Sequence, residues 1–384
     1  MRLFHISDLH LGRKLYNYSL LEEQQDMLRQ IVRYAGEMQP DAVLIAGDVY
    51  DRSMPSAEAQ ELFDEFLTDL SDLRPQPEIL VIAGNHDSAV RLSYASGFLR
   101  RHHIVIASLA PAKEEEKLTV VTLHDEYGAV DFTMLPFIRP GMLRWLPDGE
   151  PADYHEAVKA LLDRQKPDPS KRNVILAHQF FKGENTDPEL SDSETRWLSV
   201  GGLDVISAEL LGAYDYAALG HLHGPQKAGR ECIRYSGSPY PYSLSEEHHT
   251  KGIVQIDLKE KGSEPEISLL KLTPKRKVRS IRGSLAEVMK AAGDEICEDY
   301  VGITLTDDDL VRPADVLAGR YAHILEIRVD NTMSRGQIPE EEKIGSEEDP
   351  AEAFAKFYAE MNAVPMTDEE RKIIEEIIRE AGDL

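Results

Sequence analysis

Side chains able to bind metal ions occur in five short segments, each at the end of an apolar run. The residues are Asp, His and Asn, and the neighbouring glycines allow tight backbone turns. Junctions between strands and loops place such polar groups at the rim of a sheet. Each segment alone is ordinary turn chemistry, but the series predicts one common site. The segments are Asp8-Leu9-His10, Gly47-Asp48-Val49-Tyr50-Asp51, Gly84-Asn85-His86-Asp87, Ala177-His178-Gln179 and Gly220-His221-Leu222-His223.

The ligand types in these segments indicate which ions they could hold. Carboxylate or amide oxygens combined with imidazoles suit two divalent transition metals, such as manganese, iron or zinc, rather than calcium. Two cations about 3.5 to 4 Å apart can activate a water molecule and neutralise a phosphate. A carboxylate must bridge them to hold like charges that close. The chemistry to expect is therefore phosphoester hydrolysis.

The five segments follow apolar runs that alternate with longer helical patterns up to about residue 272. That rhythm is typical of layered α/β sheets. Between the first two runs, Ser19-Leu20-Leu21-Glu22 predicts a capping box at the start of a helix. The expected strands are 3–7, 42–46, 79–83, 104–107, 132–136, 174–177, 216–219 and 252–258.

The composition changes at Leu272-Thr273-Pro274, which we interpret as a domain boundary. A small helix and strand unit is expected over 283–330, followed by a polar stretch typical of a linker. Two amphipathic helices are predicted at the end, one from Asp349-Pro350 and one from a capping box at Thr367-Asp368-Glu369-Glu370. The resulting division is 1–272, 273–332, 333–348 and 349–384.

The overall composition restricts the possible partners. The 384 residues include 43 Lys and Arg against 69 Asp and Glu, a formal charge of −26. This excludes a protein whose binding rests on a basic composition, so an anionic substrate must be met locally. Cys232 and Cys297 are too few for a disulfide framework or a cysteine zinc site, and a reducing cytoplasm is expected. No run approaches the roughly 18 apolar residues of a spanning helix, so no membrane partner is expected.

Taken together, the five segments resemble the signature of the calcineurin-like metallophosphoesterase superfamily. The opening Phe4-His5-Ile6-Ser7-Asp8-Leu9-His10-Leu11-Gly12, the segment Tyr235-Ser236-Gly237-Ser238-Pro239 and the domain order resemble the nuclease subunits of bacterial SbcCD complexes. The resemblance covers essentially the whole chain. It implies an α/β fold, a β-sandwich flanked by helices in α/β/β/α layers over 1–272. It also implies a smaller α+β capping, DNA-binding domain at 273–332 and C-terminal helices that bind an ATPase at 349–384.

The resemblance further implies two divalent metal ions, with Mn²⁺ expected, that share Asp48 as a bridging ligand. The ligands implied for one ion are Asp8, His10, Asp48 and His223, and for the other Asp48, Asn85, His178 and His221.

Two further residues of the motif receive catalytic roles from the resemblance. His86 would face the scissile phosphate, where it would stabilise charge or protonate the leaving 3′ oxygen. Asp87 would orient the His86 ring by a hydrogen bond. Some relatives have a histidine where this chain has Asp51, which we interpret as a structural residue.

The implied activity is ATP-dependent 3′ to 5′ exonuclease action on double-strand DNA ends, with endonuclease action on hairpins and single strands, in recombination, replication and repair. The chain contains no Gly-x-x-x-x-Gly-Lys-Ser/Thr loop, so ATP dependence requires another protein. In the family this is the SbcC ATPase, gripped by the C-terminal helices of a nuclease homodimer within a heterotetramer. Packing of those helices onto the core is the alternative.

The charge of −26 requires an account of how DNA is bound, because DNA binding is largely phosphate neutralisation. Residues 340–384 hold 15 acidic and 5 basic residues, a local charge of −10. Two bound divalent metals would also add positive charge at the site. Candidate phosphate contacts, for which solvated surface charge is the alternative, are Arg13, Lys14, Lys275, Arg276 and Lys277.

Two other functions stay open at this point. A metallophosphoesterase for small nucleotide phosphoesters would use the same metals, but it would leave residues 273–384 without a role. A non-catalytic scaffold is disfavoured because every implied ligand and His86 are present.

Overall fold

The computed structural model describes residues 1–184, 188–195, 205–293, 295–308 and 310–330, with single residues beyond. Those are Phe354, Tyr358, Met366, Thr367, Glu370, Arg371, Lys372 and Ile374. The predicted linker and most of the two predicted C-terminal helices lie outside the described residues. Within them, no helix is long and apolar enough to cross a membrane.

The first of two large sheets contains the chain's first strand near its centre. Its order is β16 (Glu266–Lys271), β15 (Gly252–Asp257), β1 (Arg2–Ile6), β4 (Ala42–Ala46), β5 (Glu78–Ile82) and β6 (Ile104–Ala107). From β1 to β6 neighbouring strands are parallel, whereas β15 and β16 are antiparallel to their neighbours. The parallel strands are unbroken runs of Val, Ile, Leu and Ala because both faces of this part of the sheet are covered.

The second large sheet repeats this design with a parallel centre. Its order is β13 (Gln226–Ala228), β14 (Arg230–Tyr235), β12 (Tyr216–Gly220), β9 (Arg172–His178), β8 (Gly128–Leu135) and β7 (Thr119–Asp125). Strands β14, β12, β9 and β8 are parallel, and β13 and β7 pair antiparallel at the edges.

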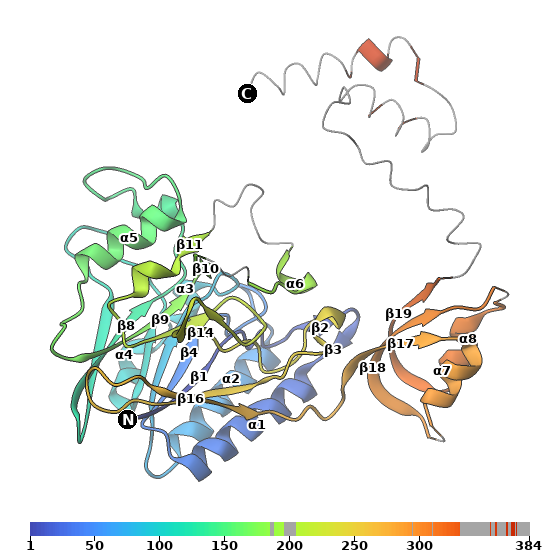
Figure 1. The fold of residues 1–384 in the computed structure, drawn as a ribbon, viewed down its shortest axis with the longest axis horizontal. Helices are drawn as coiled ribbons and strands as arrows, with labels where there is room; N and C mark the ends of the chain where they lie inside the picture. The colour runs from blue at the N-terminus through green and yellow to red at the C-terminus, as the bar shows by residue number, and fades with distance from the viewer. Residues whose placement is uncertain are drawn as a thin grey trace. The chain divides into compact units, whose positions relative to one another are not determined.

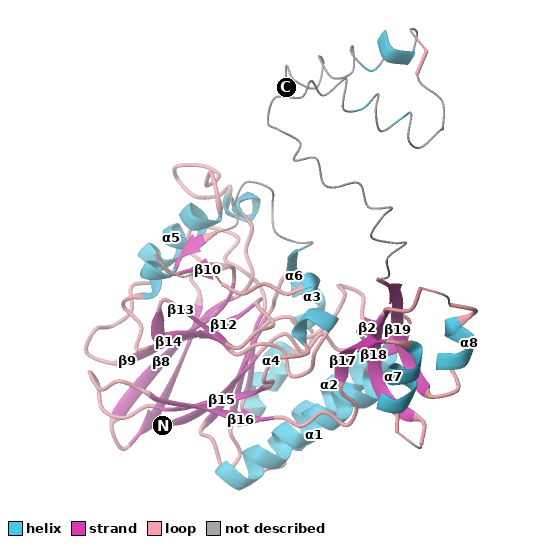
Figure 2. Cartoon of the chain, turned by 45° about the vertical axis from the view of Figure 1, so that its right-hand side comes forward, coloured by secondary structure: helices cyan, strands magenta, loops and turns pink. Residues whose placement is uncertain are grey.

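Alternate residues of the first sheet enter two different cores, which establishes the layers. Phe4 and Ile45 pack in one apolar cluster with helices α1 (Leu21–Met38) and α2 (Ala57–Ser71). Leu3 and Leu44 belong to the other cluster, which contains the second sheet and helix α5 (Tyr154–Arg164). The sheets thus face each other with helices outside them (Figures 1 and 2). The predicted α/β/β/α sandwich is confirmed.

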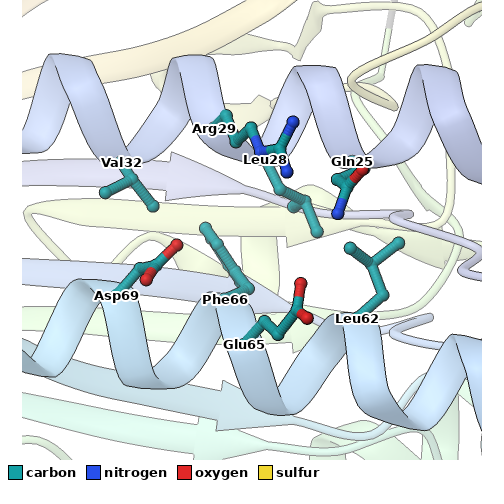
Figure 3. A pocket seen from close by; sticks show the side chains of 8 residues that line it. All are labelled: Gln25, Leu28, Arg29, Val32, Leu62, Glu65, Phe66 and Asp69. Carbon is teal, nitrogen blue, oxygen red and sulfur yellow. The ribbon is translucent and has the colours of Figure 1, made fainter.

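Helices α1 and α2 pack side by side on the first sheet. Leu28 and Val32 of α1 point towards Leu62 and Phe66 of α2, with charged side chains at the margin of the seam (Figure 3). This amphipathic pairing buries one apolar stripe from each helix. The shallow pocket between the helices contains none of the predicted ligands.

The capping box predicted at Ser19 and Glu22 is wrong. Leu20 occupies the N-cap position of α1, and no side chain caps the helix there. Ser19 instead belongs to a hairpin of β2 (Lys14–Leu15) and β3 (Tyr18–Ser19), while Glu22 accepts a hydrogen bond from Arg276 at 2.9 Å. The hairpin and the ion pair engage Ser19 and Glu22, so these residues do not form the capping box that the local sequence predicts. The box predicted at Thr367 is confirmed, because Thr367 and Glu370 cap each other's backbone N–H groups.

A third sheet follows β16 in the chain. It contains β17 (Val278–Gly283), β18 (Cys297–Leu305) and β19 (Tyr321–Val329), with helices α7 (Leu285–Ala291) and α8 (Pro313–Leu317) between its strands in the chain. Sequence reasoning did not predict β17, which lies in the basic stretch. The short elements are α3 (Ala89–Leu92), α4 (Ser96–Leu99), β10 (Phe181–Lys182), α6 (Asp192–Thr195) and β11 (Ile206–Ser207).

Candidate metal centre

The candidate ligands lie at the carboxyl ends of parallel strands in both large sheets. In the first sheet, Asp8 and His10 follow β1, Asp48 follows β4, and Asn85 and His86 follow β5. In the second, His178 ends β9, and His221 and His223 follow β12. Since β12 lies beside β9 and β4 lies beside both β1 and β5, these ends are neighbours.

The ligands predicted for one ion converge. His10 Nε2 lies 3.2 Å from His223 Nε2 and 3.7 Å from Asp48 Oδ2. One ligand atom each from Asp8, His10 and His223 lie within 4.8 Å of one another. All four side chains are buried.

The ligands predicted for the second ion converge as well. Asn85 Oδ1 lies 3.1 Å from His178 Nε2 and 3.0 Å from His221 Nδ1. Asp48 Oδ2 lies 3.2 Å from His178 Nε2. The Asp48 carboxylate is thus close to both ligand sets, as a bridging ligand must be. His86 also lies near the first set, in a group with His10 and Asp48.

The hydrogen bonds around His178 test whether the site fits a cation. Its Nδ1 lies 2.7 Å from the carbonyl oxygen of Ala46, which can only accept, so Nδ1 carries the hydrogen. In the neutral ring, the lone pair of Nε2 then faces the Asp48 carboxylate, another acceptor. A cation between these atoms removes the repulsion. The residues present therefore fit a pair of divalent ions.

The electrostatics of the site are set by burial and by two carboxylates. Burial lowers the pKa of His10, and it lowers the pKa of His221 to about 3, so both rings are neutral ligands. Burial opposes charge on His178 too, but the carboxylates of Asp48 and Asp8 outweigh it and raise its pKa to about 9. The negative potential that retains a proton there would equally attract a cation, which would displace the proton.

Several of these residues have a backbone conformation that side chains other than glycine rarely adopt. The φ angles are 54° at Asp8, 44° at His10, 49° at Asp48 and 103° at His221. Such conformations cost about 1 to 3 kcal/mol each and persist where the surroundings enforce them. Here the loops after β1 and β4 bind each other, with Asp8 N–H donating to Gly47 O and His10 N–H to Asp48 O, both at 3.0 Å.

His86 differs from the other rings because both its main chain and its side chain bind neighbouring loops. Its backbone N–H donates to Asp48 Oδ1 at 2.8 Å, and its Nδ1 donates to the carbonyl oxygen of Asp51 at 2.8 Å. Its Nδ1 atom thus binds the Asp51 carbonyl and not the Asp87 carboxylate, which was predicted to orient the ring. The turn at Gly84 folds the Asp87 carboxylate back onto the backbone N–H groups of Val49, Tyr50 and Gly84, at 2.9 to 3.1 Å.

An open cavity lies over the ligands. Arg13 lines it and is only partly exposed, since it pairs with Asp51 at 3.2 Å and stacks over the Tyr242 ring at 5.1 Å. Lys14 is exposed but does not line it. The full lining is His10, Arg13, Asp48, Asn85, His86, Ser193, Glu194, His221 and His223.

The other predicted phosphate contacts do not line this cavity. Arg276 pairs with Glu22 at 2.9 Å and Glu23 at 2.5 Å at the start of α1, and Lys275 lies 3.5 Å from Glu22. The side chain of Arg276 is therefore held by acidic partners. A contact of Lys275, Arg276 or Lys277 with DNA stays a prediction.

Sequence reasoning missed four polar residues around His223. Ser193 and Glu194 line the cavity, and Glu246 and Lys251 are buried behind the ring. The candidate ligands were identified because each follows an apolar strand. None of these four residues follows one. The sequence around Glu246 is rich in Ser and Glu, which is typical of an exposed loop.

Comparisons with known proteins agree with this geometry. The calcineurin-like phosphoesterase family matches residues 1–225, and the family described as type 5 capsule protein repressor C-terminal domain matches residues 274–362. Among solved structures, a TM-score of 0.40 relates the chain to the protein TT1561 of Thermus thermophilus, at 13% identity over 70% of this chain and 98% of that one.

Curated relatives match at higher identity. The chain is 33% identical to the D subunit of the SbcCD nuclease of Bacillus subtilis, over 96% of this chain and 95% of that protein. It is 31% identical to the same SbcCD component of Staphylococcus epidermidis, over 76% of this chain and 74% of that protein. The chain belongs to the calcineurin-like phosphoesterase family and, within it, to the group of nuclease SbcCD D subunits.

Proposed function

We propose that this chain is a metal-dependent DNA nuclease and forms the nuclease subunit of an SbcCD complex. The observation that supports this is that the predicted ligands lie close together and that five of them, His10, Asp48, Asn85, His221 and His223, line one open cavity with His86. Its substrates are DNA phosphodiesters at double-strand ends, hairpins and single strands. Its relatives are named as nuclease subunits of that complex.

The proposed cofactor is a pair of Mn²⁺ ions. Asp8, His10, Asp48 and His223 would hold one ion, and Asp48, Asn85, His178 and His221 the other. When bound, such a pair supplies positive charge at the phosphate and lowers the pKa of a water molecule. The buried carboxylates and neutral imidazoles hold the pair in place and keep it inside one cavity.

His86 would serve as the acid towards the leaving group. Its Nδ1 proton is engaged by the carbonyl oxygen of Asp51. In the protonated ring, Nε2 therefore carries the proton that is available to a leaving 3′ oxygen. Asp87 supports this role indirectly, because it binds the N–H groups of the loops that hold His86.

DNA would approach the cavity past Arg13, its partly exposed cation. Lys14, Lys275, Arg276 and Lys277 would contact phosphates farther along the duplex. Because charge elsewhere on the chain is predominantly acidic, the binding should depend strongly on salt.

Two protein partners complete the proposal. Val90, Tyr94 and Phe98 are exposed by 73, 85 and 64% within the short segment that contains α3 and α4, which supports a homodimer through this segment. The SbcC ATPase would bind the predicted C-terminal helices, giving a heterotetramer that uses ATP to open duplex ends.

Both cysteines are free, as expected in a reducing cytoplasm, where we place the complex.

Cleavage assays with Mn²⁺ on a linear duplex, a DNA hairpin and a small phosphodiester test this function. Wild type is compared with Asp48→Asn, with and without SbcC and ATP. We expect DNA cleavage that Asp48→Asn abolishes and that SbcC with ATP stimulates on duplex ends. Turnover of the small diester alone, unchanged by SbcC, would retain the metal chemistry and reject the role in DNA processing.

A further inference from the structure

A buried ion pair lies directly behind His223. Glu246 Oε2 and Lys251 Nζ are 2.6 Å apart, and their side chains are 0% and 4% exposed. Removing two charges from water costs several kcal/mol per ion, which the attraction between them offsets only with good geometry and additional hydrogen bonds. Neither residue is one of the candidate ligands. The cost of burying this pair therefore directs attention to the additional hydrogen bonds that the two side chains make.

The additional bonds hold His223 at two points. Glu246 Oε1 lies 3.2 Å from His223 Nδ1, and Lys251 Nζ donates to the backbone oxygen of His223 at 2.9 Å. Ser193 Oγ also donates to Glu246 Oε1, at 2.9 Å. Ring and main chain of His223 are thus attached to the same ion pair.

This attachment determines which ring nitrogen carries the hydrogen. A carboxylate only accepts hydrogen bonds, and Ser193 Oγ, which lies 3.0 Å from the same Nδ1, gives its hydrogen to Glu246. Both neighbours of Nδ1 therefore accept, and Nδ1 is protonated. In the neutral ring, Nε2 then has the lone pair, and Nε2 is the atom that faces His10 Nε2 at 3.2 Å, inside the ligand set. Loss of the carboxylate would allow the opposite tautomer, whose Nε2 cannot bind a metal.

We infer that Glu246 and Lys251 act as a positioning pair that fixes the tautomer and orientation of His223 for metal binding. Glu246 holds the ring, and Lys251 fixes the Glu246 carboxylate and the His223 backbone. The inference rests on the proposed metal-dependent function. Partners of this kind typically change metal affinity by about 10- to 100-fold when removed.

The test measures Co²⁺ and Mn²⁺ binding to the full chain by calorimetry, with the visible spectrum of bound Co²⁺ as a direct report on ligand geometry. The variants are Glu246→Gln, Lys251→Met and the double variant. Glu266→Gln is the control, because Glu266 forms an exposed pair with Lys259. We expect Glu246→Gln to lower the affinity for one of the two ions by about 10- to 100-fold and to alter the Co²⁺ spectrum. The control variant should match wild type in both.

The double variant separates positioning from simple charge balance. It leaves no unpaired buried charge, so it should recover folding stability lost in either single variant. If the pair positions His223, the double variant still binds one ion weakly and keeps the altered spectrum. Wild-type affinity and spectrum in a folded Glu246→Gln or double variant would overturn the inference. Failure of wild type to bind two ions or to cleave DNA would instead reject the proposed function.

Discussion

Three histidine rings at the cavity are oriented by the hydrogen bond that each makes through its Nδ1 atom. His178 and His223 each donate from Nδ1 to a protein oxygen, a carbonyl and a carboxylate, and direct Nε2 into the ligand sets. His86 likewise donates from Nδ1 to a backbone carbonyl, that of Asp51. Its proposed role towards the substrate rests instead on its partly exposed position in the lining of the cavity.

Replacing His86 should therefore separate chemistry from metal binding. We expect His86→Ala to retain both ions and to lose at least about two orders of magnitude in cleavage rate, the scale for a positioned acid or charge stabiliser. Metal content by mass spectrometry and a cleavage assay test this, with the exposed His124→Ala as the matched control. Loss of an ion in His86→Ala would identify His86 as a ligand.

The loops after β4 and β5 pack so closely that a single added methyl group at Gly84 would clash with Asp48. A Cβ atom on Gly84 would lie 2.1 Å from Asp48 Oδ1 and 2.4 Å from the Asp48 backbone nitrogen. Both distances are far below van der Waals contact, and the backbone cannot yield without moving the Asp48 carboxylate.

Gly84→Ala should consequently damage the site as well as the fold. We expect a loss of about 1 to 3 kcal/mol in stability, the usual cost of overpacking, and weaker binding of both ions. Urea unfolding and metal titration measure the two effects. Gly128→Ala is a useful comparison for the site, since no atom lies within 4 Å of its Cβ position. Full metal affinity in Gly84→Ala would contradict the close fit.

A second strand-end contact predicts a dependence of stability on pH. Arg172, 2% exposed at the start of β9, bonds both carboxylate oxygens of Asp125 at the end of β7. Burial acts to raise the pKa of Asp125, but hydrogen bonds from Arg172 and from the amino group of Met1, 2.7 Å away, outweigh it, so the pKa is well below the ordinary value. The pair therefore stabilises the fold above the unfolded-state pKa of about 4, and this contribution is lost as the pH falls.

Asp125→Asn should cost roughly 2 kcal/mol at pH 7, because it leaves the Arg172 charge without its partner. The difference from wild type should shrink as the pH falls below about 4, because the Asp125 carboxylate of the unfolded wild-type chain then binds a proton while that of the folded protein stays charged. Urea unfolding at pH 7 and pH 3.5 measures both values. An equal difference at the two pH values would show that the charge of Asp125 is not what stabilises the contact.

Elements with strong local signals were predictable, and those that depend on distant partners were not. Strands β4 and β6 were predicted at their observed bounds because their runs of apolar residues are uninterrupted. Strand β17 was missed because its basic residues resemble a boundary, although Asp299 of β18 pairs with Arg279 at 2.7 Å. Glu246 carries no local signal either. Its partner His223 lies 23 positions earlier in the chain and becomes a neighbour only after folding.

At the scale of the whole molecule, the exposed apolar side chains Val90, Tyr94 and Phe98 of the α3–α4 segment predict the assembly state. We expect the double variant Tyr94→Asp and Phe98→Asp to convert a homodimer to a monomer in light scattering, because two charges would be buried in the interface. Tyr127→Asp, at a tyrosine 45% exposed, is the control. A monomeric wild type, or a variant that stays dimeric, would exclude this segment as the interface. Metal content should be unchanged in both variants.

The position of β1 between β4 and β15 has a consequence for biosynthesis. Leu3 pairs with Ile256, so β1 is synthesised about 250 residues before this neighbour. The candidate ligands are spread in the same way, from Asp8 to His223, and the ion pair behind His223 is completed only at Lys251. Non-local pairing of this kind slows folding. A nascent chain therefore cannot bring the candidate ligands together until His223 has been translated, and β1 cannot gain its neighbour β15 until still later.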